Sequence, residues 1–495
     1  MKMPEPDQGV IARRDEIVAA LRAIVPGEGV IDSAAELRPY ETDALTAYRQ
    51  TPLVVVLPET VEQVAAVLRW CSENRVNVVP RGAGTSLSGG ALPLADGVLV
   101  GLGKFNRILE LDTANRMAVV QPGVTNAAIS EAARPYGLYY APDPSSQIAC
   151  TIGGNVAENS GGVHCLKYGL TTHNVLGVEL VLINGDILRI GGKTLDRQGY
   201  DLLGLIVGSE GLLGIVTEVT VRLLPAPEAV RALLLGFASV EAAGQCVADI
   251  IAEGVVPAGV EMMDRPAIHA AEAFLQIGYP LDVEALLIVE VDGPPAECDH
   301  LVGIVTEIAR RNFATTLRQS QSEEERLSFW AGRKAAFPAV GRISPDYYCV
   351  DGTIPRRRLP EMLSRMAEMS ARYGLGVANV FHAGDGNLHP LILYDDSKPG
   401  QFDAAEAFGA EILRLCVEMG GVLTGEHGVG VEKRDLMPAM FTPVDLDHQQ
   451  RVKCALDPDL LLNPGKMFPT LRRCAELGRE HVHGGKLAFP ELPRF

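Results

Sequence analysis

Histidine and carboxylate side chains that could hold a metal ion gather in two glycine-rich stretches of the C-terminal half. His382 and His389 lie in one stretch, and Glu426 and His427 lie in the other. Two histidines and one carboxylate that leave a coordination position open form a catalytic set for a divalent cation. Histidines satisfied inside an apolar core are the alternative, but three of the ten histidines fall in these two stretches. We therefore expect His382, His389 and Glu426 to bind a divalent metal, with zinc as the favoured ion.

His427 follows Glu426 directly and has two interpretations. It could be a fourth ligand, or it could be a general base, because an unperturbed imidazole titrates near about pH 6.5 and can accept a proton at neutral pH. The residues alone leave both roles open.

A large extended ligand is indicated by three stretches of glycine and small residues in the N-terminal half. They cover residues 80–90, 142–162 and 208–216, and the first directly follows a predicted strand. Glycines allow consecutive amides to turn toward one anion, as a pyrophosphate requires. The first stretch does not fit the GxGxxG pattern, because Leu87 replaces the third glycine, and it lacks the lysine of a P-loop. A Rossmann site for NAD is therefore disfavoured.

The elements that must position these groups follow from the apolar pattern. Strands alternate with helices through most of the chain, and Pro225 and Pro227 mark a probable boundary. A Gly-Asp-Gly turn between two apolar runs predicts a hairpin with His382 and His389 at its mouth. The predicted helices are 10–25, 61–73, 126–134 and 298–312, and the predicted strands are 53–57, 76–79, 117–120, 178–182, 187–190, 215–223, 285–291, 377–381 and 391–394.

Composition excludes several classes of partner. The formal net charge is −18, which argues against nucleic acid, because phosphate binding needs a basic surface. We find no secretory signal and no apolar run long enough to span a membrane. The cysteines lack the spacing of an Fe–S site. We expect a cytoplasmic chain.

The three small-residue stretches, in their order, carry a specific resemblance. RGAGTSLSGG, then PDPSS and TIGGNVAENSGG, then GSEGLLGIVTEVTVRLLP resemble the FAD-binding domain of vanillyl-alcohol oxidase and p-cresol methylhydroxylase over roughly residues 50–225. The resemblance implies FAD, held without a covalent bond, since no attachment motif surrounds Cys150, His164 or Cys165. The resemblance also implies three sets of contacts with FAD. The pyrophosphate would be bound by Arg81, Gly82, Ala83, Gly84, Thr85, Ser86 and Gly89, and the flavin ring would be contacted by Pro142, Ser146, Gly153, Asn155, Ser160 and Gly161. Ile215 or Val216 would close over the adenine side.

The C-terminal stretches resemble the FAD-linked 2-hydroxy-acid oxidases and dehydrogenases, which include flavin-type D-lactate dehydrogenases and glycolate oxidases. In that family His382, His389 and Glu426 correspond to metal ligands and His427 to the base. Arg333, in FWAGRK, corresponds to an arginine that grips the substrate carboxylate; a surface arginine is the alternative. Cys349 replaces a lysine of members that handle dicarboxylates, which favours a small monocarboxylate.

These observations predict an α+β protein. A two-subdomain FAD-binding domain of the vanillyl-alcohol-oxidase type is followed by an α+β FAD-linked oxidase C-terminal (substrate) domain, with the active site between them. The expected segments are an N-terminal helical segment at 1–47, the FAD-binding domain at 48–227, the substrate and metal domain at 228–470 and a tail at 471–495.

The expected reaction is oxidation of glycolate to glyoxylate, with hydride transfer to FAD. D-lactate dehydrogenase is the alternative within the family. A flavin-bearing structural subunit and a non-redox member, such as an alkyl-glycerone-phosphate synthase, are alternatives outside that chemistry. Substrate-driven reduction of the flavin separates both from the expected reaction.

Partners are expected because this chain lacks any second redox centre. The resemblance is closest to the FAD subunits of bacterial glycolate oxidases and implies additional subunits, including a second FAD-type subunit and an Fe–S subunit. The tail carries Leu487, Phe489, Leu492 and Phe495 and either folds back on its own chain or docks on such a partner. Any association with the inner membrane is expected to be peripheral and to depend on those partners.

Overall fold

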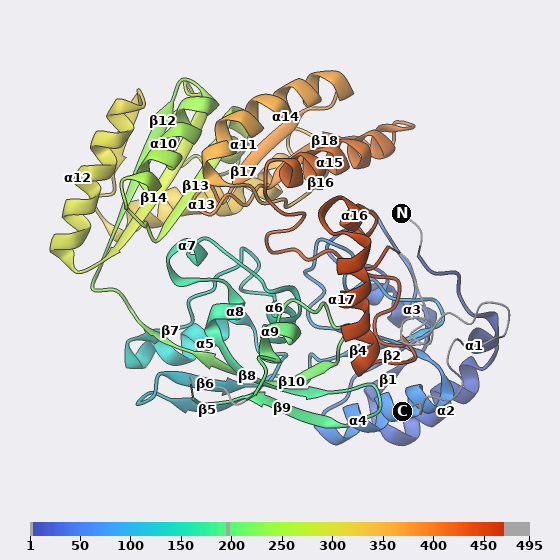
Figure 1. Ribbon diagram of the computed structural model, residues 1–495. Coiled ribbons are helices and arrows are strands. Elements are labelled where there is room, and N and C mark those ends of the chain that lie inside the picture. The colour runs from blue at the N-terminus through green and yellow to red at the C-terminus, as the bar shows by residue number, and fades with distance from the viewer. Residues whose placement is uncertain (1–2, 195–198, 470–495) are drawn as a thin grey trace, which may run out of the picture.

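The computed structural model describes residues 3–194 and 199–469, and it consists of two lobes (Figure 1). The first lobe contains strands β1 to β11 and the second contains β12 to β18. The expected tail at 471–495 lies outside the described residues. No helix in the described ranges is long and apolar enough to cross a membrane.

The first lobe contains a four-stranded sheet in the order β1-β2-β4-β3. β2 (Val54–Val56), β4 (Gly97–Gly101) and β3 (Asn77–Arg81) are parallel, and β1 (Val30–Ile31) is antiparallel to β2. Valines 54 to 56 are fully buried, as expected for a parallel sheet covered on both faces. The crossover helix α4 (Val61–Asn74) begins where Thr60 Oγ1 accepts a hydrogen bond from the Gln63 amide.

A five-stranded antiparallel sheet completes the first lobe. Its order is β5 (Ile108–Asp112), β6 (Met117–Val120), β10 (Ile215–Arg222), β8 (Val175–Val181) and β9 (Ile187–Gly191). The predicted strands at 117–120, 178–182, 187–190 and 215–223 are confirmed within a few residues. The single helix predicted for 10–25 is instead divided at Arg13 into α1 (Gln8–Ala12) and α2 (Arg14–Ile24).

The second lobe is built on a seven-stranded antiparallel sheet. Its order is β15 (Thr316–Gln319), β12 (Ala229–Phe237), β14 (Ala285–Gly293), β13 (Gly259–Asp264), β17 (Val377–Phe381), β18 (Pro390–Tyr394) and β16 (Asp346–Cys349). Successive residues of β12 (Ala229–Phe237) point to opposite faces, so Leu233 and Leu235 join one hydrophobic cluster and Leu234 joins another. The first cluster includes α10 (Val240–Ala252), α12 (Pro295–Arg311), α14 (Leu359–Tyr373) and α15 (Gln401–Glu418), and the second includes α11 (Arg265–Leu275) and α13 (Glu323–Val340).

The last described helix returns to the first lobe. α17 (Pro443–Leu456) lies beside the sheets of that lobe (Figure 1), and its buried Lys453 donates to the carbonyls of Leu212 and Leu462. Val78 of β3 pairs with Leu462 through an isolated parallel bridge. The C-terminal part of the segment expected at 228–470 therefore packs on the FAD-binding lobe rather than on the seven-stranded sheet.

Candidate active site

A cavity in the first lobe brings the three small-residue stretches together. Of the fifteen positions predicted to contact FAD, Gly89, Pro142 and Gly161 do not line this cavity. The Pro142 carbonyl accepts from Asn126 Nδ2 at 3.0 Å, and Gly89 packs against Val431. The other twelve line it: Arg81, Gly82, Ala83, Gly84, Thr85, Ser86, Ser146, Gly153, Asn155, Ser160, Ile215 and Val216.

This cavity contains buried polar atoms to which a ligand would bind. Thr151 Oγ1 and Asn155 Nδ2 are buried and have no hydrogen-bond partner among the described residues. Gly82 approaches Thr151 so closely that an added Cβ would lie 2.6 Å from Oγ1, and one added at Gly153 would lie 2.6 Å from Pro122. A ligand rich in hydrogen-bonding groups, which FAD is, fits such a cradle.

The residues near this cavity that could form a covalent flavin bond are engaged or buried. His164 Nδ1 lies 2.7 Å from Asp143 Oδ2, and Nε2 lies 3.1 Å from Glu290 Oε1. Cys150 and Cys165 are buried thiols whose pKa burial raises. Of the three, only Cys150 lines the cavity, as a free thiol whose raised pKa disfavours the thiolate.

The candidate metal ligands converge at the far end of the same cavity. The predicted hairpin is present, formed by β17 (Val377–Phe381) and β18 (Pro390–Tyr394). Its turn holds His382 and His389 so that Nε2 of each lies 3.2 and 3.3 Å from Glu426 Oε1. One ligand atom from each of the three side chains lies within 4.8 Å of the others. His389 Nε2 is buried without a hydrogen-bond partner among the described residues, as expected of an atom meant for a metal.

Charged neighbours set the ionisation of this cluster. Burial alone would lower the pKa of His382, but the carboxylates of Glu261 and Glu426 raise it well above its usual range. Burial and the neighbouring His427 and His382 lower the pKa of His389 well below its usual range. Burial opposes ionisation of Glu426, yet its hydrogen bond to His382 and the nearby imidazoles lower its pKa. Glu426 is therefore a carboxylate and His389 a neutral imidazole, both of which are metal-binding forms, whereas His382 would release a proton on binding a metal.

Glu261, which the sequence pattern did not single out, orients His382. It lies in β13 (Gly259–Asp264) and is 1% exposed, and its Oε1 lies 2.7 Å from His382 Nδ1. A carboxylate on the second ring nitrogen fixes the tautomer and orientation of a metal-binding histidine. The signal in the sequence was an acid inside the apolar run GVEMM, and periodicity alone predicts a core strand for this run.

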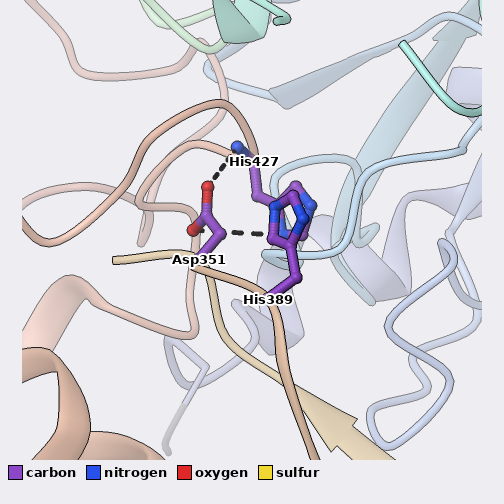
Figure 2. Close-up of side chains that lie close together, drawn as sticks. All are labelled: Asp351, His389 and His427. Atoms are coloured by element: carbon purple, nitrogen blue, oxygen red, sulfur yellow. Dashed lines mark hydrogen bonds and ion pairs between the residues drawn. The ribbon is translucent and has the colours of Figure 1, made fainter. Parts of the chain in front are cut away.

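Asp351, also not predicted as part of the site, fixes the loop that carries Glu426 and His427. It follows β16 (Asp346–Cys349), and its Oδ2 accepts the amides of Gly425, Glu426 and His427 at 3.0, 2.8 and 2.7 Å. Figure 2 shows the Asp351 carboxylate beside the overlapping rings of His389 and His427, whose centroids are 4.9 Å apart. His427 Nδ1 lies 3.9 Å from Asp351 Oδ1.

A buried lysine balances Asp351. Lys433 Nζ lies 2.7 Å from Asp351 Oδ1 and 2.9 Å from Glu432 Oε2, and both Asp351 and Lys433 are 0% exposed. Burial would raise the pKa of Asp351, but Lys433 and the nearby histidines hold it at about 2. Asp351, His389 and His427 are also close enough to form a metal set. That alternative is disfavoured because Asp351 is already neutralised by Lys433 and accepts three amides.

Arg333, the predicted carboxylate grip, is buried in α13 and points at Glu261. Its Nε and Nη2 lie 2.8 and 2.7 Å from Glu261 Oε2. The guanidinium expected to grip the substrate carboxylate is therefore already paired with Glu261, and this pair leaves Nη1 and one Nη2–H unused. Arg333 itself does not line the cavity. Phe337, one turn later on α13, lines the cavity together with His389, Glu426 and His427.

Two family models match this chain. The FAD binding domain matches residues 52–191, and the C-terminal domain of FAD linked oxidases matches residues 226–467. The glycolate oxidase subunit GlcD of Escherichia coli (strain K12) is 57% identical over 97% of both chains. The subunit of the same name from Bacillus subtilis (strain 168) is 40% identical over 89% of this chain and 94% of its own. A D-lactate dehydrogenase of Anaerostipes hadrus is 32% identical over 91% and 97%.

Solved structures share the fold at low sequence identity. A p-cresol methylhydroxylase with bound substrate is 18% identical and superposes with a TM-score of 0.78 over 93% of this chain and 97% of its own. A 4-ethylphenol oxidase from Gulosibacter chungangensis has the same identity and TM-score over 94% and 99%. These likenesses establish the two-domain α+β fold and no more.

Proposed function

This chain belongs to the family of FAD-linked oxidases, and from that premise we propose that it oxidises glycolate to glyoxylate. One observation carries the proposal: His389, Glu426 and His427 line the same cavity as the predicted FAD contacts. A substrate held by the metal set would therefore lie beside the flavin. The 57% identical relative is named as a glycolate oxidase subunit, which supports glycolate among the 2-hydroxy acids.

Two bound groups complete the proposed site. FAD would accept a hydride, and we propose that it is held without a covalent bond, because both nitrogens of His164 are engaged and the raised pKa of Cys150, the thiol that lines the cavity, disfavours its thiolate. A divalent cation, zinc by our proposal, would act as a Lewis acid at His382, His389 and Glu426. Nε2 of His389 supports this ligand set, because it makes no hydrogen bond with the described residues.

His427 is the proposed base. It lies next to the proposed metal ligands and lines the cavity, and the hydrogen bond that its backbone amide donates to Asp351 Oδ2 fixes its position. It would take the proton of the substrate hydroxyl as the C2–H bond breaks. Arg333 is proposed to hold the substrate carboxylate. Glu261 occupies its Nε–H and one Nη2–H, so Nη1 and the second Nη2–H would bind the two oxygens of the substrate carboxylate.

The side chains around the site favour a small substrate. The Phe337 ring centroid lies 6.3 Å from that of His389, close to where a substituent on C2 would extend. Cys349 is buried and offers no positive charge for a second carboxylate. D-lactate remains the second candidate, supported by the relative named as a D-lactate dehydrogenase.

Electrons are proposed to leave through other subunits. The GlcD relatives are named as subunits, so we propose a complex with a second FAD-type subunit and an Fe–S subunit. The chain would lie in the cytoplasm or, through those partners, at the inner membrane. The isolated chain should then reduce its flavin with glycolate and reoxidise slowly with oxygen or quinone. Fast quinone-linked turnover without partners would contradict this.

The experiment that tests the substrate is anaerobic bleaching of the flavin by a panel of 2-hydroxy acids. Glycolate, D-lactate, L-lactate and D-2-hydroxyglutarate would each be added to the holoenzyme. We expect glycolate to give the highest kcat/KM for reduction and D-2-hydroxyglutarate to give none. A higher value for D-lactate would favour the second candidate, and no bleaching by any acid would reject oxidation of 2-hydroxy acids.

A further inference from the structure

Glu158 places a carboxyl group inside the flavin cavity, where none of the proposed steps uses it. It is the last residue of α6 (Ile152–Glu158), and it lines the cavity together with Ser86, Gly90 and His427. Its Oε2 is buried and has no hydrogen-bond partner among the described residues. An acid on the helix that also carries Gly153 and Asn155, two of the predicted flavin contacts, needs an explanation, because a negative charge there would weaken the binding of a cofactor that already carries a charged pyrophosphate.

Two glycines make room for this carboxyl. A Cβ built on Gly428, in the loop after His427, would lie 2.1 Å from Glu158 Oε2. A Cβ built on Gly90, at the end of the first small-residue stretch, would lie 2.8 Å from Oε1. Gly428 also has a φ of +84°, which disfavours any side chain. The chain thus keeps both flanks of Glu158 free of side chains and fixes the carboxyl between the two lobes.

A second acid close by determines which of the two is ionised. The same Cβ on Gly428 would lie 3.1 Å from Glu210 Oε1, so the two carboxyls are near neighbours. Burial raises the pKa of Glu210 too, but its carboxylate accepts the amides of Val429 and Gly430 at 2.6 and 2.7 Å, which favours the charged form. Glu158 has no such amides. Burial, Glu210 and Asp43 raise its pKa well above the usual range, and Lys433 and Ser86 oppose them only in part.

We propose that Glu158 is a neutral carboxylic acid that donates a hydrogen bond to the bound flavin and stabilises its reduced form. Reduction adds electron density to the ring, so an acceptor atom of the flavin binds a neutral donor more strongly afterwards. An ionised Glu158 would do the opposite by repulsion. The inference depends on FAD occupying this cavity, and it does not depend on the identity of the substrate.

The midpoint potential of the flavin tests the proposal, measured on holoenzyme against a reference dye with a chemical reductant and no 2-hydroxy acid. Glu158→Gln retains a neutral donor and should keep the wild-type potential. Glu158→Leu removes the donor and should lower the equilibrium constant for reduction roughly 3- to 10-fold, the usual value of one hydrogen bond. Glu179→Gln is the matched control, because Glu179 is a buried acid of the same lobe that pairs with Arg189 and does not line the cavity.

The direction in which the midpoint potential of the flavin changes distinguishes the possible roles of Glu158. If both Gln and Leu raise the potential, Glu158 is ionised in the holoenzyme and the proposal is wrong. If neither variant changes the potential, Glu158 makes no contact that depends on the redox state of the flavin, and the proposal is again wrong. If the Leu variant loses FAD, Glu158→Ala replaces it, and the FAD dissociation constants of the Gln and Ala variants are compared. Tighter binding by Gln than by Ala supports the donor, and equal binding with equal potentials contradicts it.

Discussion

The flavin cavity and the cluster of proposed metal ligands with their charged supports, called the metal cluster below, have His389 and Glu426 in common but are built in different ways. The flavin cavity is lined mainly by backbone and small side chains from stretches that are each continuous in sequence. The metal cluster is made of buried charges brought from β13, α13, β16, the β17–β18 turn and the 424–433 loop. Loss of one group should therefore be mild in the first region, where many weak contacts share the ligand. It should be severe in the second, where each charge depends on a particular partner.

The largest effect is expected at the proposed base. His427→Ala should slow reduction of the flavin by glycolate about 10²- to 10⁴-fold, the usual contribution of a positioned base, while FAD content stays normal. Anaerobic stopped-flow absorbance measures both. His269→Ala, in α11 of the second lobe, is the control and should reduce normally. A His427→Ala rate close to wild type would place the base elsewhere.

A large loss of stability is expected where the buried charges depend on one another. Asp351→Ala removes the acceptor of three amides and one of the two carboxylates that pair with the buried Lys433, so the free energy of unfolding should fall by about 3–5 kcal/mol. Denaturant titration of the holoenzyme measures the change. Glu361→Ala, which removes an exposed pair with Arg358, should have no clear effect. Equal stability of the two variants would show that the cluster is not held together by charge.

A smaller effect is expected at the carboxylate behind His382. Glu261→Gln keeps the shape of the side chain but loses the charge, and it should weaken metal affinity about 10- to 100-fold. Metal content after dialysis against graded chelator gives the affinity. Because Glu261 also holds Arg333, the KM for glycolate should rise as well. Unchanged metal affinity would mean that His382 does not bind the ion.

The smallest effect is expected in the flavin cavity. Thr151→Val removes the partnerless Oγ1 while preserving shape, and it should weaken FAD binding only about 3- to 10-fold. Fluorescence titration of the apoprotein with FAD gives the dissociation constant. A loss as large as that of a cluster variant would overturn the contrast between the two regions.

The difference between the flavin cavity and the metal cluster also explains which features could be predicted from the sequence. The strands, the main helices and the hairpin with His382 and His389 follow from local periodicity and turn residues, which act over a few positions. Twelve of the fifteen expected FAD positions line one cavity because each stretch is continuous.

The supports of the metal cluster could not be found in the same way. Glu261 and Asp351 are single acids within apolar strands or at their ends, and their partners lie 72 to 121 and 74 to 76 residues away. Only the tertiary fold pairs them. The same holds for Arg333, where the sequence indicated a side chain free for substrate and the fold supplies Glu261 as a partner.

The central claim is that the first region binds FAD by itself and the second oxidises the substrate through its metal. The direct test is anaerobic single-turnover bleaching by glycolate of three samples: holoenzyme, enzyme dialysed against chelator, and dialysed enzyme resupplied with zinc. We predict that the dialysed enzyme keeps its full flavin spectrum, fails to bleach with glycolate, and recovers when zinc is restored. Undiminished bleaching in a sample shown by metal analysis to be metal-free would contradict the account.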